Sequence, residues 1–524
     1  MWTEKIIGPP GTGKTTALID RVKKELADGV EPQFIGFYSF SRMATKVALD
    51  RVLAAFPTYT RADFDHFRTI HSECFRLLHL NREAVVSNTH KREFCKTFGY
   101  RISEQQITEG DEEFPEILLK EDGDWLFFFY NWKKSLLLDM TEAYRIFWGL
   151  NHDKVPAFWS EPFIMNFAER YDDFKKQKGL WDFSDMAWET CEKRLRPGLQ
   201  VLFKDEAQDS SPLLYKVLDV FLENVQRHYL AGDPDQAIYV WQGARPELFN
   251  SRPYDELTYL RQSWRIPRKV HSLATKILNP PDYRPRPAPG SVEQVSLETF
   301  CDDIQLYPGQ KYIMVRHLYQ MPDLCSTLYK YGIWFDNLRG PSPSKGNDAV
   351  RFMVALKYLR GGHFEVADFW RLIEHIPAKN NFRRGFKKEI ESLAKERPNM
   401  VFTRQDIGMD VSDAFKQHPL SFVPMKAEKQ AYYIRMSREH GEDFFKQRPD
   451  VLLGTIHAFK GAECEWAIIL SDMTKKAWET SQKAETHYDE ARVWYTGVTR
   501  AKEGCVLVPA EGYYSWPWPG ELDG

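Results

Sequence analysis

The sequence lacks the features that mark membrane proteins and disulfide-stabilised proteins. Its 524 residues contain seven scattered cysteines and no C-x-x-C pair, which argues against a zinc or iron–sulfur module and favours a reducing compartment. No apolar run approaches the roughly twenty residues that a membrane-spanning helix needs. The chain begins directly with a strand-like segment, so we expect no signal peptide and a cytoplasmic location.

The sequence also lacks a strong net charge. Its formal net charge is −3 at pH 7, so any nucleic acid must bind in a local groove rather than through an overall basic charge. Hydrophobic residues make up 43% of the chain, charged residues 28% and aromatic residues 14%. This composition is typical of a globular protein, and the length predicts about three to four domains.

The most specific pattern present is a phosphate-binding loop at residues 8–15, which read G-P-P-G-T-G-K-T and match G-x-x-x-x-G-K-[ST]. It lies between a strand-like Ile6-Ile7 and a helical apolar pattern, the context in which such loops hold nucleotide phosphates. Lys14 would reach the β/γ oxygens, and the Thr15 hydroxyl would bind Mg2+. The expected phosphate-binding residues are Gly8, Gly11, Thr12, Gly13, Lys14, Thr15 and Thr16. The sequence therefore predicts a nucleoside triphosphatase.

A second acidic pattern ends another buried strand at residues 201–209, which read V-L-F-K-D-E-A-Q-D. Asp205 is predicted to hold Mg2+ through water. Glu206 would polarise the attacking water as a general base. Two acids at a strand end could instead cap the next helix, but their pairing with a phosphate-binding loop favours the catalytic interpretation.

The order of strand and helix signals predicts an α/β fold with two parallel-sheet units, each interrupted by a mostly helical insertion. The expected ranges are 1–72 and 176–256 for the first unit, 73–175 for its insertion, 257–342 and 448–524 for the second unit, and 343–447 for a short, polar second insertion. The aromatic run W-L-F-F-F-Y at residues 125–130 is expected to form the core of an insertion helix.

Further motifs follow in a fixed order. They are G-D-P-D-Q-A-I-Y-V-W at residues 232–241, Q-S-W-R at 262–265, T-I-H-A-F-K-G-A-E at 455–463 and V-T-R-A-K at 498–502. Together with the two patterns above, they make the chain resemble superfamily 1 DNA helicases of the UvrD/Rep/PcrA-like branch, from Gly8 to Lys502. The short second insertion would suit a compact, phage-encoded or otherwise minimal member. The resemblance implies two RecA-like motor domains with ATP and Mg2+ between them.

The resemblance extends the expected nucleotide site. Gln236 would sense the γ-phosphate, Trp264 would stack on adenine, and Glu463 would lie by the ribose. Arg265 and Arg500 would meet the phosphates from across the cleft, with Arg500 as a finger from the second motor domain. Such arginines stabilise charge on the transferred phosphoryl group when the cleft closes. Relatives also carry a glutamine well before the phosphate-binding loop, which reads the adenine edge, whereas the loop here starts at Gly8; the sequence therefore gives no basis for expecting strict selectivity for ATP.

The resemblance also implies a path for single-stranded DNA over both motor domains. Aromatic side chains at Phe40 and Trp241 suit single strands because every base has a π-face. The expected DNA-facing residues are Phe40, Thr69, His71, Tyr239, Trp241, Thr455 and His457. The basic segment 379–388 would suit either duplex phosphates or a solvated helix face.

Three functions remain open from the sequence. The leading one is an ATP-dependent DNA helicase that translocates 3′–5′ on single-stranded DNA and unwinds duplex. The second is a translocase that removes bound proteins and unwinds only with a partner, and the third is a non-motor accessory ATPase subunit. The complete set of catalytic candidates favours a motor. We expect contacts with single-stranded DNA, duplex junctions and a single-strand-binding or loading protein, in a monomer or weak dimer.

Overall fold

Two six-stranded parallel sheets organise the computed structural model, which describes residues 1–103, 121–151, 155–156, 158–338, 346–423 and 425–520. The first sheet has the spatial order β3 (Phe67–Arg68), β2 (Ile35–Tyr38), β4 (Val201–Lys204), β5 (Arg227–Gly232), β1 (Trp2–Ile7) and β6 (Glu256–Tyr259). The second has the order β11 (Phe335–Asn337), β14 (Val451–Thr455), β10 (Lys311–Val315), β15 (Cys464–Leu470), β16 (Ala501–Val508) and β9 (Ser291–Gln294). The expected α/β fold class is confirmed.

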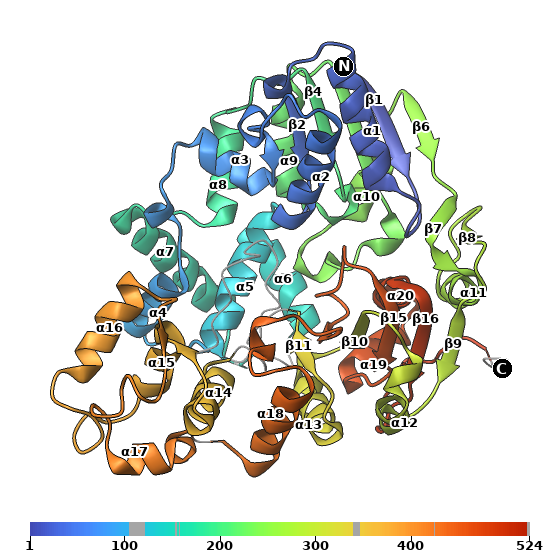
Figure 1. Ribbon diagram of the computed structural model, residues 1–524. Helices are drawn as coiled ribbons and strands as arrows, with labels where there is room; N and C mark the ends of the chain where they lie inside the picture. The colour runs from blue at the N-terminus through green and yellow to red at the C-terminus, as the bar shows by residue number, and fades with distance from the viewer. Residues whose placement is uncertain (104–120, 152–154, 157, 339–345, 424, 521–524) are drawn as a thin grey trace.

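Helices cover both faces of the first sheet, which is why its central strands are almost continuously apolar. These helices are α1 (Lys14–Ala27), α2 (Arg42–Ala55), α3 (Ile70–Leu77), α8 (Phe183–Glu192), α9 (Pro212–Leu222) and α10 (Pro246–Ser251). In β4, Phe203 packs with the core under α1 and α2, and its neighbour Leu202 packs with the core under α8 and α9. Figure 1 shows this sheet and its helices at the top of the molecule.

A helical segment with its own aromatic core interrupts the first sheet between β3 and β4. It contains α4 (Asn88–Phe98), α5 (Asp122–Ser135), α6 (Met140–Asn151) and α7 (Glu161–Lys178). Four residues of the run 125–130 are buried in this core, namely Leu126, Phe127, Phe129 and Tyr130, as expected for an insertion helix. The predicted start at residue 73 is too early, because Cys74 on α3 is buried in the core under the first sheet.

The second sheet is covered by α11 (Arg268–Ile277), α12 (Leu297–Asp302), α13 (Met321–Tyr331), α19 (Lys475–Ser481) and α20 (Ala484–Val498). Two smaller ribbons pair β7 (Gln262–Pro267) with β8 (Arg284–Arg286), and β12 (Phe364–Glu365) with β13 (Val401–Phe402). The first ribbon follows β6 directly along the chain, which brings the Q-S-W-R motif out of the first sheet towards the second.

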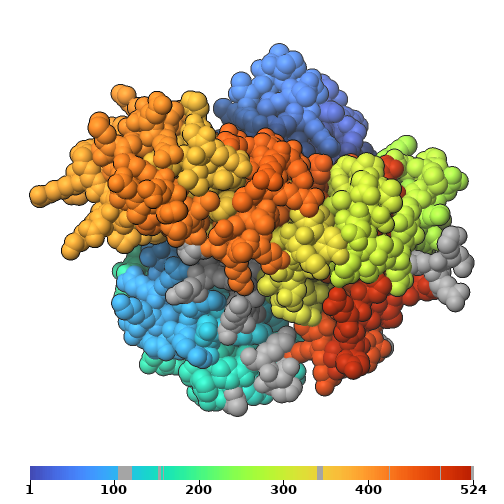
Figure 2. Space-filling model, turned by 60° about the horizontal axis from the view of Figure 1, so that its bottom comes forward, coloured from blue at the N-terminus to red at the C-terminus, as the bar shows by residue number. Residues whose placement is uncertain are grey.

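A second helical segment contains α14 (Asn347–Arg360), α15 (Val366–Ile373), α16 (Phe386–Glu396), α17 (Asp413–Gln417) and α18 (Ala427–Glu439). This segment, expected to be helical and polar, also contributes to the core, since Phe352 and Met353 on α14 are fully buried in a core shared with the second sheet. Lys357 on the same helix is buried and pairs with Asp443 at 2.7 Å. A charged residue of this helix thus lies in the interior, where a sequence pattern would place it on the surface. Figure 2 shows this segment, in orange, as a lobe projecting from the molecule.

The boundary expected at residue 257 falls inside β6, which pairs with β1 and so belongs to the first sheet. The polar edge strand E-L-T-Y lacks the apolar run by which the central strands were recognised. The other boundary, at residues 342 and 343, lies outside the described residues. None of the helices in the described ranges combines the length and apolar character needed to cross a bilayer.

Candidate nucleotide and nucleic-acid site

The phosphate-binding loop connects β1 to the N-terminus of α1, as the sequence predicts. Gly13 caps α1 with φ 89°, and Gly11 has φ 74°, both in the left-handed region that glycine adopts without a Cβ clash. A Cβ on Gly11 would lie 2.6 Å from the Cβ of Arg265 and 2.7 Å from Oγ of Ser263. The loop therefore requires glycine for its conformation and for the close approach of β7.

The strand β7 and the loop are joined by hydrogen bonds. The backbone N–H of Trp264 donates to the Gly11 carbonyl at 2.8 Å. The hydroxyls of Ser263 and Tyr283 donate to the Pro10 carbonyl at 3.1 and 2.8 Å. These contacts fix Trp264, which is 72% exposed, beside the loop, where a planar base could stack on its ring. Sequence reasoning identified Trp264 but assigned no role to Ser263 or Tyr283.

The two predicted metal ligands lie together. The Thr15 hydroxyl donates to a carboxylate oxygen of Asp205 at 2.8 Å, across the neighbouring ends of α1 and β4. A hydroxyl and a carboxylate are hard oxygen donors of the kind that Mg2+ prefers, and phosphates and water commonly complete its shell. Burial, with the adjacent Glu206 charge, raises the pKa of Asp205 to about 6. The Lys14 ammonium donates to the Gly8 carbonyl at 2.6 Å and lies 4.0 Å from Asp233.

Glu206 is held in a left-handed conformation with φ 50°, which is unusual for a residue with a side chain. Its backbone N–H donates to Asp205 at 3.0 Å, and the Gln208 amide donates to its carboxylate at 2.5 Å. Burial opposes ionisation of Glu206, but the charges of Lys460 and Lys14 hold its pKa below the ordinary value. The carboxylate is therefore ionised at neutral pH, as a general base must be before it accepts a proton.

A residue next to the second sheet contacts the candidate nucleotide-binding residues of the first sheet directly. Arg500, which precedes β16 and is 2% exposed, donates to the Gln236 side-chain oxygen at 2.9 Å. The Gln236 amide donates in turn to Asp233 at 2.6 Å. Burial and the neighbouring Arg265 lower the pKa of Arg500 to about 10, so it remains a cation at neutral pH. The predicted sensor and finger residues are thus in contact.

The second predicted arginine has a carboxylate partner. Arg265 donates through Nε to Glu463 at 2.9 Å, and Lys502 lies 2.7 Å from the other oxygen of that carboxylate. Glu463 lies between these two cations, on the loop before β15. The ion pair between Arg265 and Glu463 joins β7 to the second sheet beside the exposed ring of Trp264.

One buried ion pair was absent from the sequence predictions. Lys460, from the loop after β14, binds both carboxylate oxygens of Asp209 at 2.6 and 2.5 Å, and it also donates to the Gln236 carbonyl. Both residues lie in motifs that the sequence revealed, the K of T-I-H-A-F-K-G and the last D of D-E-A-Q-D. Their pairing depends on how the two sheets meet, which no local pattern specifies.

The predicted DNA-facing aromatic residues form a continuous series of rings. Successive ring centroids lie 4.9 Å apart for Phe40 and Tyr239, 6.0 Å for Tyr239 and His457, 6.4 Å for His457 and Trp241, and 5.7 Å for Trp241 and Phe128. We call these five residues the aromatic row. The row joins the loops after β2, β5 and β14 to helix α5. Phe128 is the member that sequence reasoning missed, because it was assigned to the insertion core.

Several expected DNA contacts are buried or bonded within the protein. Tyr239 is 2% exposed and is stacked on Phe40. The Thr69 hydroxyl caps α3, and the His71 ring packs edge-on against Phe183. The Thr455 hydroxyl accepts a hydrogen bond from a backbone N–H three residues later. Direct DNA contact by these side chains stays a prediction, whereas Trp241, 41% exposed, presents ring surface to solvent.

The basic segment 379–388 is also partly engaged within the protein. Arg383 pairs with Asp410 and with Glu389. The Lys387 ammonium donates to two backbone carbonyls near the end of α15, at 2.8 and 2.9 Å. These contacts give both cations a structural role in the second helical segment.

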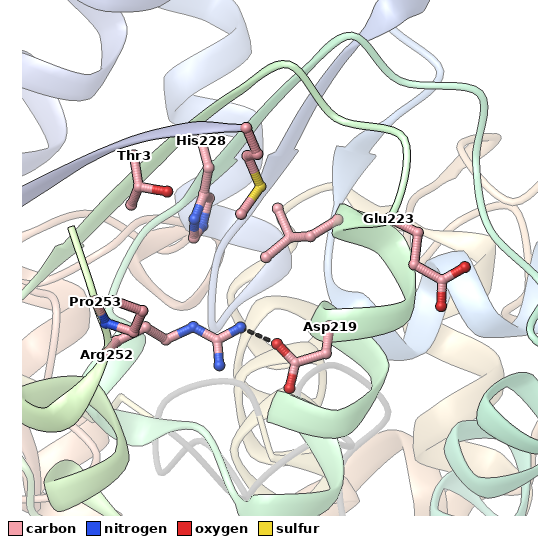
Figure 3. A pocket seen from close by; sticks show the side chains of 8 residues that line it. Thr3, Asp219, Glu223, His228, Arg252 and Pro253 are labelled. Atoms are coloured by element: carbon pink, nitrogen blue, oxygen red, sulfur yellow. Dashed lines mark hydrogen bonds and ion pairs between the residues drawn. The ribbon is translucent and has the colours of Figure 1, made fainter. Parts of the chain in front are cut away.

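A cavity of about 470 Å³ lies at the amino ends of the strands of the first sheet, away from the candidate nucleotide site. Figure 3 shows Thr3 and His228, near the starts of β1 and β5, with the ion pair between Arg252 and Asp219 on its other side. Burial lowers the pKa of His228 to about 3, so this ring is neutral. The cavity is separate from the candidate nucleotide site, whose residues lie at the carboxyl ends of the strands.

Comparison with known proteins agrees with these motifs. The UvrD/REP helicase N-terminal domain family matches residues 3–255. A probable DNA helicase II homolog of Mycoplasma pneumoniae is 26% identical over 287 residues, which cover 51% of this chain and 39% of that protein. The ATP-dependent DNA helicase Rep of Buchnera aphidicola is 20% identical over 260 residues, covering 48% of this chain and 36% of that protein.

The putative ATP-dependent DNA helicase YjcD of Bacillus subtilis is 23% identical over 323 residues, covering 57% of this chain and 38% of that protein. The chain thus covers less than half of the length of each of these three relatives. The family match lies within the first half of the chain and includes the phosphate-binding loop, the D-E-A-Q-D motif and the G-D-P-D-Q-A-I-Y-V-W motif. This part of the chain is therefore similar to the UvrD/REP helicase N-terminal domain.

Proposed function

We propose that the protein is an ATP-dependent DNA helicase whose two sheets are the cores of RecA-like motor domains. The observation that carries the proposal is the contact of Arg500 with Gln236 at 2.9 Å. It brings a buried cation of the second sheet to the phosphate-binding side of the first. A site divided in this way can link the nucleotide state to the separation of two domains, which a translocating motor requires.

In this proposal each group of residues has a separate role in ATP hydrolysis. Lys14 and the loop backbone bind the phosphates, and Glu206 orients the attacking water and accepts its proton. Arg500 and Arg265 stabilise the charge that develops on the transferred phosphoryl group. Mg2+, held by Thr15 and Asp205, would neutralise charge on the β- and γ-phosphates.

The connection after β5 offers a route from hydrolysis to DNA. Gln236 contacts Arg500 at the nucleotide side, and Tyr239, only three residues later, lies in the aromatic row. A change in the position of Gln236 would therefore move the loop that carries Trp241. We propose that single-stranded DNA stacks on this loop and is translocated 3′–5′, the polarity that the family resemblance implies.

The domain division belongs to the same proposal. The first motor domain comprises the first sheet with α1–α3 and α8–α10, and the second comprises the second sheet with its covering helices. The segments α4–α7 and α14–α18 are their insertions. We expect the protein to act as a monomer or weak dimer in the cytoplasm, with a single-strand-binding or loading protein as a partner.

The proposal is tested by measuring the ATPase rate with and without single-stranded DNA, beside strand displacement on duplexes with 3′ or 5′ tails. Stimulation by DNA with displacement only from the 3′ tail supports a helicase of this polarity. A rate that DNA leaves unchanged would contradict a DNA-driven motor and favour the accessory ATPase.

A translocase that unwinds only with a partner is the second candidate. It is favoured by the internal contacts of Arg383 and Lys387, because cations held within the protein are less available to grip duplex phosphates. Stimulation of the ATPase by DNA without strand displacement would support this candidate, and displacement by the protein alone would exclude it.

A further inference from the structure

The exposed indole of Trp241 lies against a helix of the first helical segment. Its ring is stacked on Phe128 of α5, with centroids 5.7 Å apart and planes inclined by 26°. On another side, its ring meets His457 edge-on, at 88°. The orientation of the indole is therefore set by one residue of the helical segment and one residue of the loop that follows β14.

Phe128 differs from its neighbours on α5. Phe127 and Phe129 are buried in the core of the helical segment, whereas Phe128 is only partly buried at the edge of that core. It packs edge-on against Trp125 and tilted against Phe147, with centroids 6.3 and 6.2 Å away. Phe128 thus has a rigid support behind it while its ring meets Trp241.

The backbone of the Trp241 loop also follows α5. Its turn closes with a hydrogen bond from the Gly243 N–H to the Val240 carbonyl at 3.0 Å. A Cβ on Gly243 would lie 3.5 Å from Ser135 and 3.7 Å from Leu136, at the C-terminal end of α5. The loop therefore contacts α5 at two places about two helical turns apart, so the helix can hold it in one orientation.

We propose that Phe128 is a positioning residue for single-strand binding, which fixes the plane of the Trp241 indole and makes the α4–α7 segment part of the DNA-binding surface. The inference rests on the proposed function, because it requires a strand that stacks on Trp241. An aromatic pair of this kind contributes enough to change DNA affinity by about three- to ten-fold when it is lost.

The variants separate ring stacking from simple filling of space. Phe128→Ala removes the ring, Phe128→Leu keeps an apolar side chain without a ring face, and Phe128→Tyr keeps the ring. Phe158→Ala is the matched control, because Phe158 is an exposed aromatic residue of the same segment, 65% accessible, that packs against Phe163. Affinity for fluorescently labelled oligo(dT) is measured by anisotropy, for each variant alone and combined with Trp241→Ala.

We expect Phe128→Ala and Phe128→Leu to weaken oligo(dT) binding by about three- to ten-fold, and Phe128→Tyr and Phe158→Ala to bind like the wild type. In the Trp241→Ala background, the Phe128 changes should have almost no further effect, because Phe128 acts through the indole. Should Phe128→Ala fail to fold, Phe128→Leu provides the same comparison. Wild-type affinity in both variants, or an equal loss with and without Trp241, would overturn the inference. Failure of the wild type to bind oligo(dT) would instead overturn the proposed function.

Discussion

Lys460 and Asp209 form a buried ion pair that joins the carboxyl edge of the second sheet to that of the first. The ammonium binds both oxygens of the carboxylate, and their side chains are 6% and 0% exposed. The same ammonium donates to the Gln236 carbonyl, so the pair lies beside the contact between Gln236 and Arg500. Any separation of the two sheets must break this pair and also the contact between Gln236 and Arg500.

Replacing Lys460 by methionine should weaken the association of the two sheets. Removing one partner leaves the other charge buried and unpaired, which costs about 3–5 kcal/mol, and separation of the sheets relieves that cost by admitting water. We expect a longer mean distance between dyes placed on the two sheets. The double variant Lys460→Met with Asp209→Asn should recover most of the wild-type distance.

Lys475→Met is the matched control, because Lys475 forms an exposed pair with Glu479 at 3.7 Å and such pairs contribute about 0–1 kcal/mol. An equal change in the control and in Lys460→Met would show that the buried pair is not what holds the sheets together.

The pair also predicts a pH dependence. Burial raises the pKa of Asp209 from 3.8 to about 6, against the lowering effect of Lys460, with Glu206 and Lys204 also facing it. The folded protein therefore binds this proton more tightly than the unfolded chain. The contribution of Asp209 to the free energy of unfolding is greatest below about pH 4 and decreases by up to about 3 kcal/mol as the pH rises to about 6.

This contribution appears in the difference between the unfolding free energies of the wild type and Asp209→Asn, measured by urea denaturation from pH 4 to pH 8. We expect the difference to change between pH 4 and pH 6 and to level off above pH 7. A difference that is constant over the whole range would mean that Asp209 has the same pKa in the folded and unfolded states.

The central strands were predictable because an apolar run buried on both faces is a local property. The strand β4, Val201–Lys204, coincides with the V-L-F-K run of the buried strand that we expected before Asp205. The edge strands β6 and β9, E-L-T-Y and S-V-E-Q, were missed because their residues are partly polar and partly exposed. The strand β16 was missed because its first residues, Ala501 and Lys502, were interpreted only as part of a motif.

The candidate nucleotide site could be outlined from the sequence for a similar reason, since Lys14, Asp205 and Gln236 each belong to a short motif at a strand end. What the sequence lacked was information on which motifs touch. The pairing of Lys460 with Asp209 and the stacking of Phe128 on Trp241 both join residues far apart in the chain. Nothing in the residues near Phe128 distinguishes it from the four other aromatic side chains in the run from Trp125 to Tyr130.

Glu206→Gln should lower the turnover number for ATP hydrolysis by about 10²–10⁴-fold, because the amide cannot accept the proton of the attacking water. The amide is close in size to the carboxylate, so binding of single-stranded DNA should persist. The rate of phosphate release and the affinity for oligo(dT) are measured on the same preparation. Glu192→Gln, on the exposed face of α8, is the control. Near-normal hydrolysis by Glu206→Gln would rule it out as the general base.

Gly11→Ala should impair nucleotide binding, and by more than a glycine-to-alanine change that causes backbone strain alone. The new Cβ would lie 2.6 Å from the Cβ of Arg265, so the loop or β7 must shift. Gly29→Ala is a matched control with φ 93°, where a Cβ meets no atom of the described residues within 4 Å. Both variants incur backbone strain of about 1 kcal/mol, which a thermal melt detects. Only Gly11→Ala should raise the dissociation constant for a fluorescent ATP analogue, and an equal rise in both would attribute the effect to strain alone.

Trp241 and Trp264 are two exposed tryptophans, and we predict that replacing the first changes DNA binding and replacing the second changes ATP binding. Trp241 belongs to the aromatic row, whereas the Trp264 backbone is bonded to Gly11 of the phosphate-binding loop at 2.8 Å. Loss of base stacking costs about 1–3 kcal/mol per base, so Trp241→Ala should weaken oligo(dT) binding by about five- to 150-fold. Trp264→Ala should instead raise the KM for ATP. Titrations of the ATPase with DNA at saturating ATP, and with ATP at saturating DNA, separate the two. If both variants shifted the same parameter, one of the rings would have been assigned to the wrong ligand, because stacking on a nucleobase of DNA and stacking on adenine of ATP respond to different titrants.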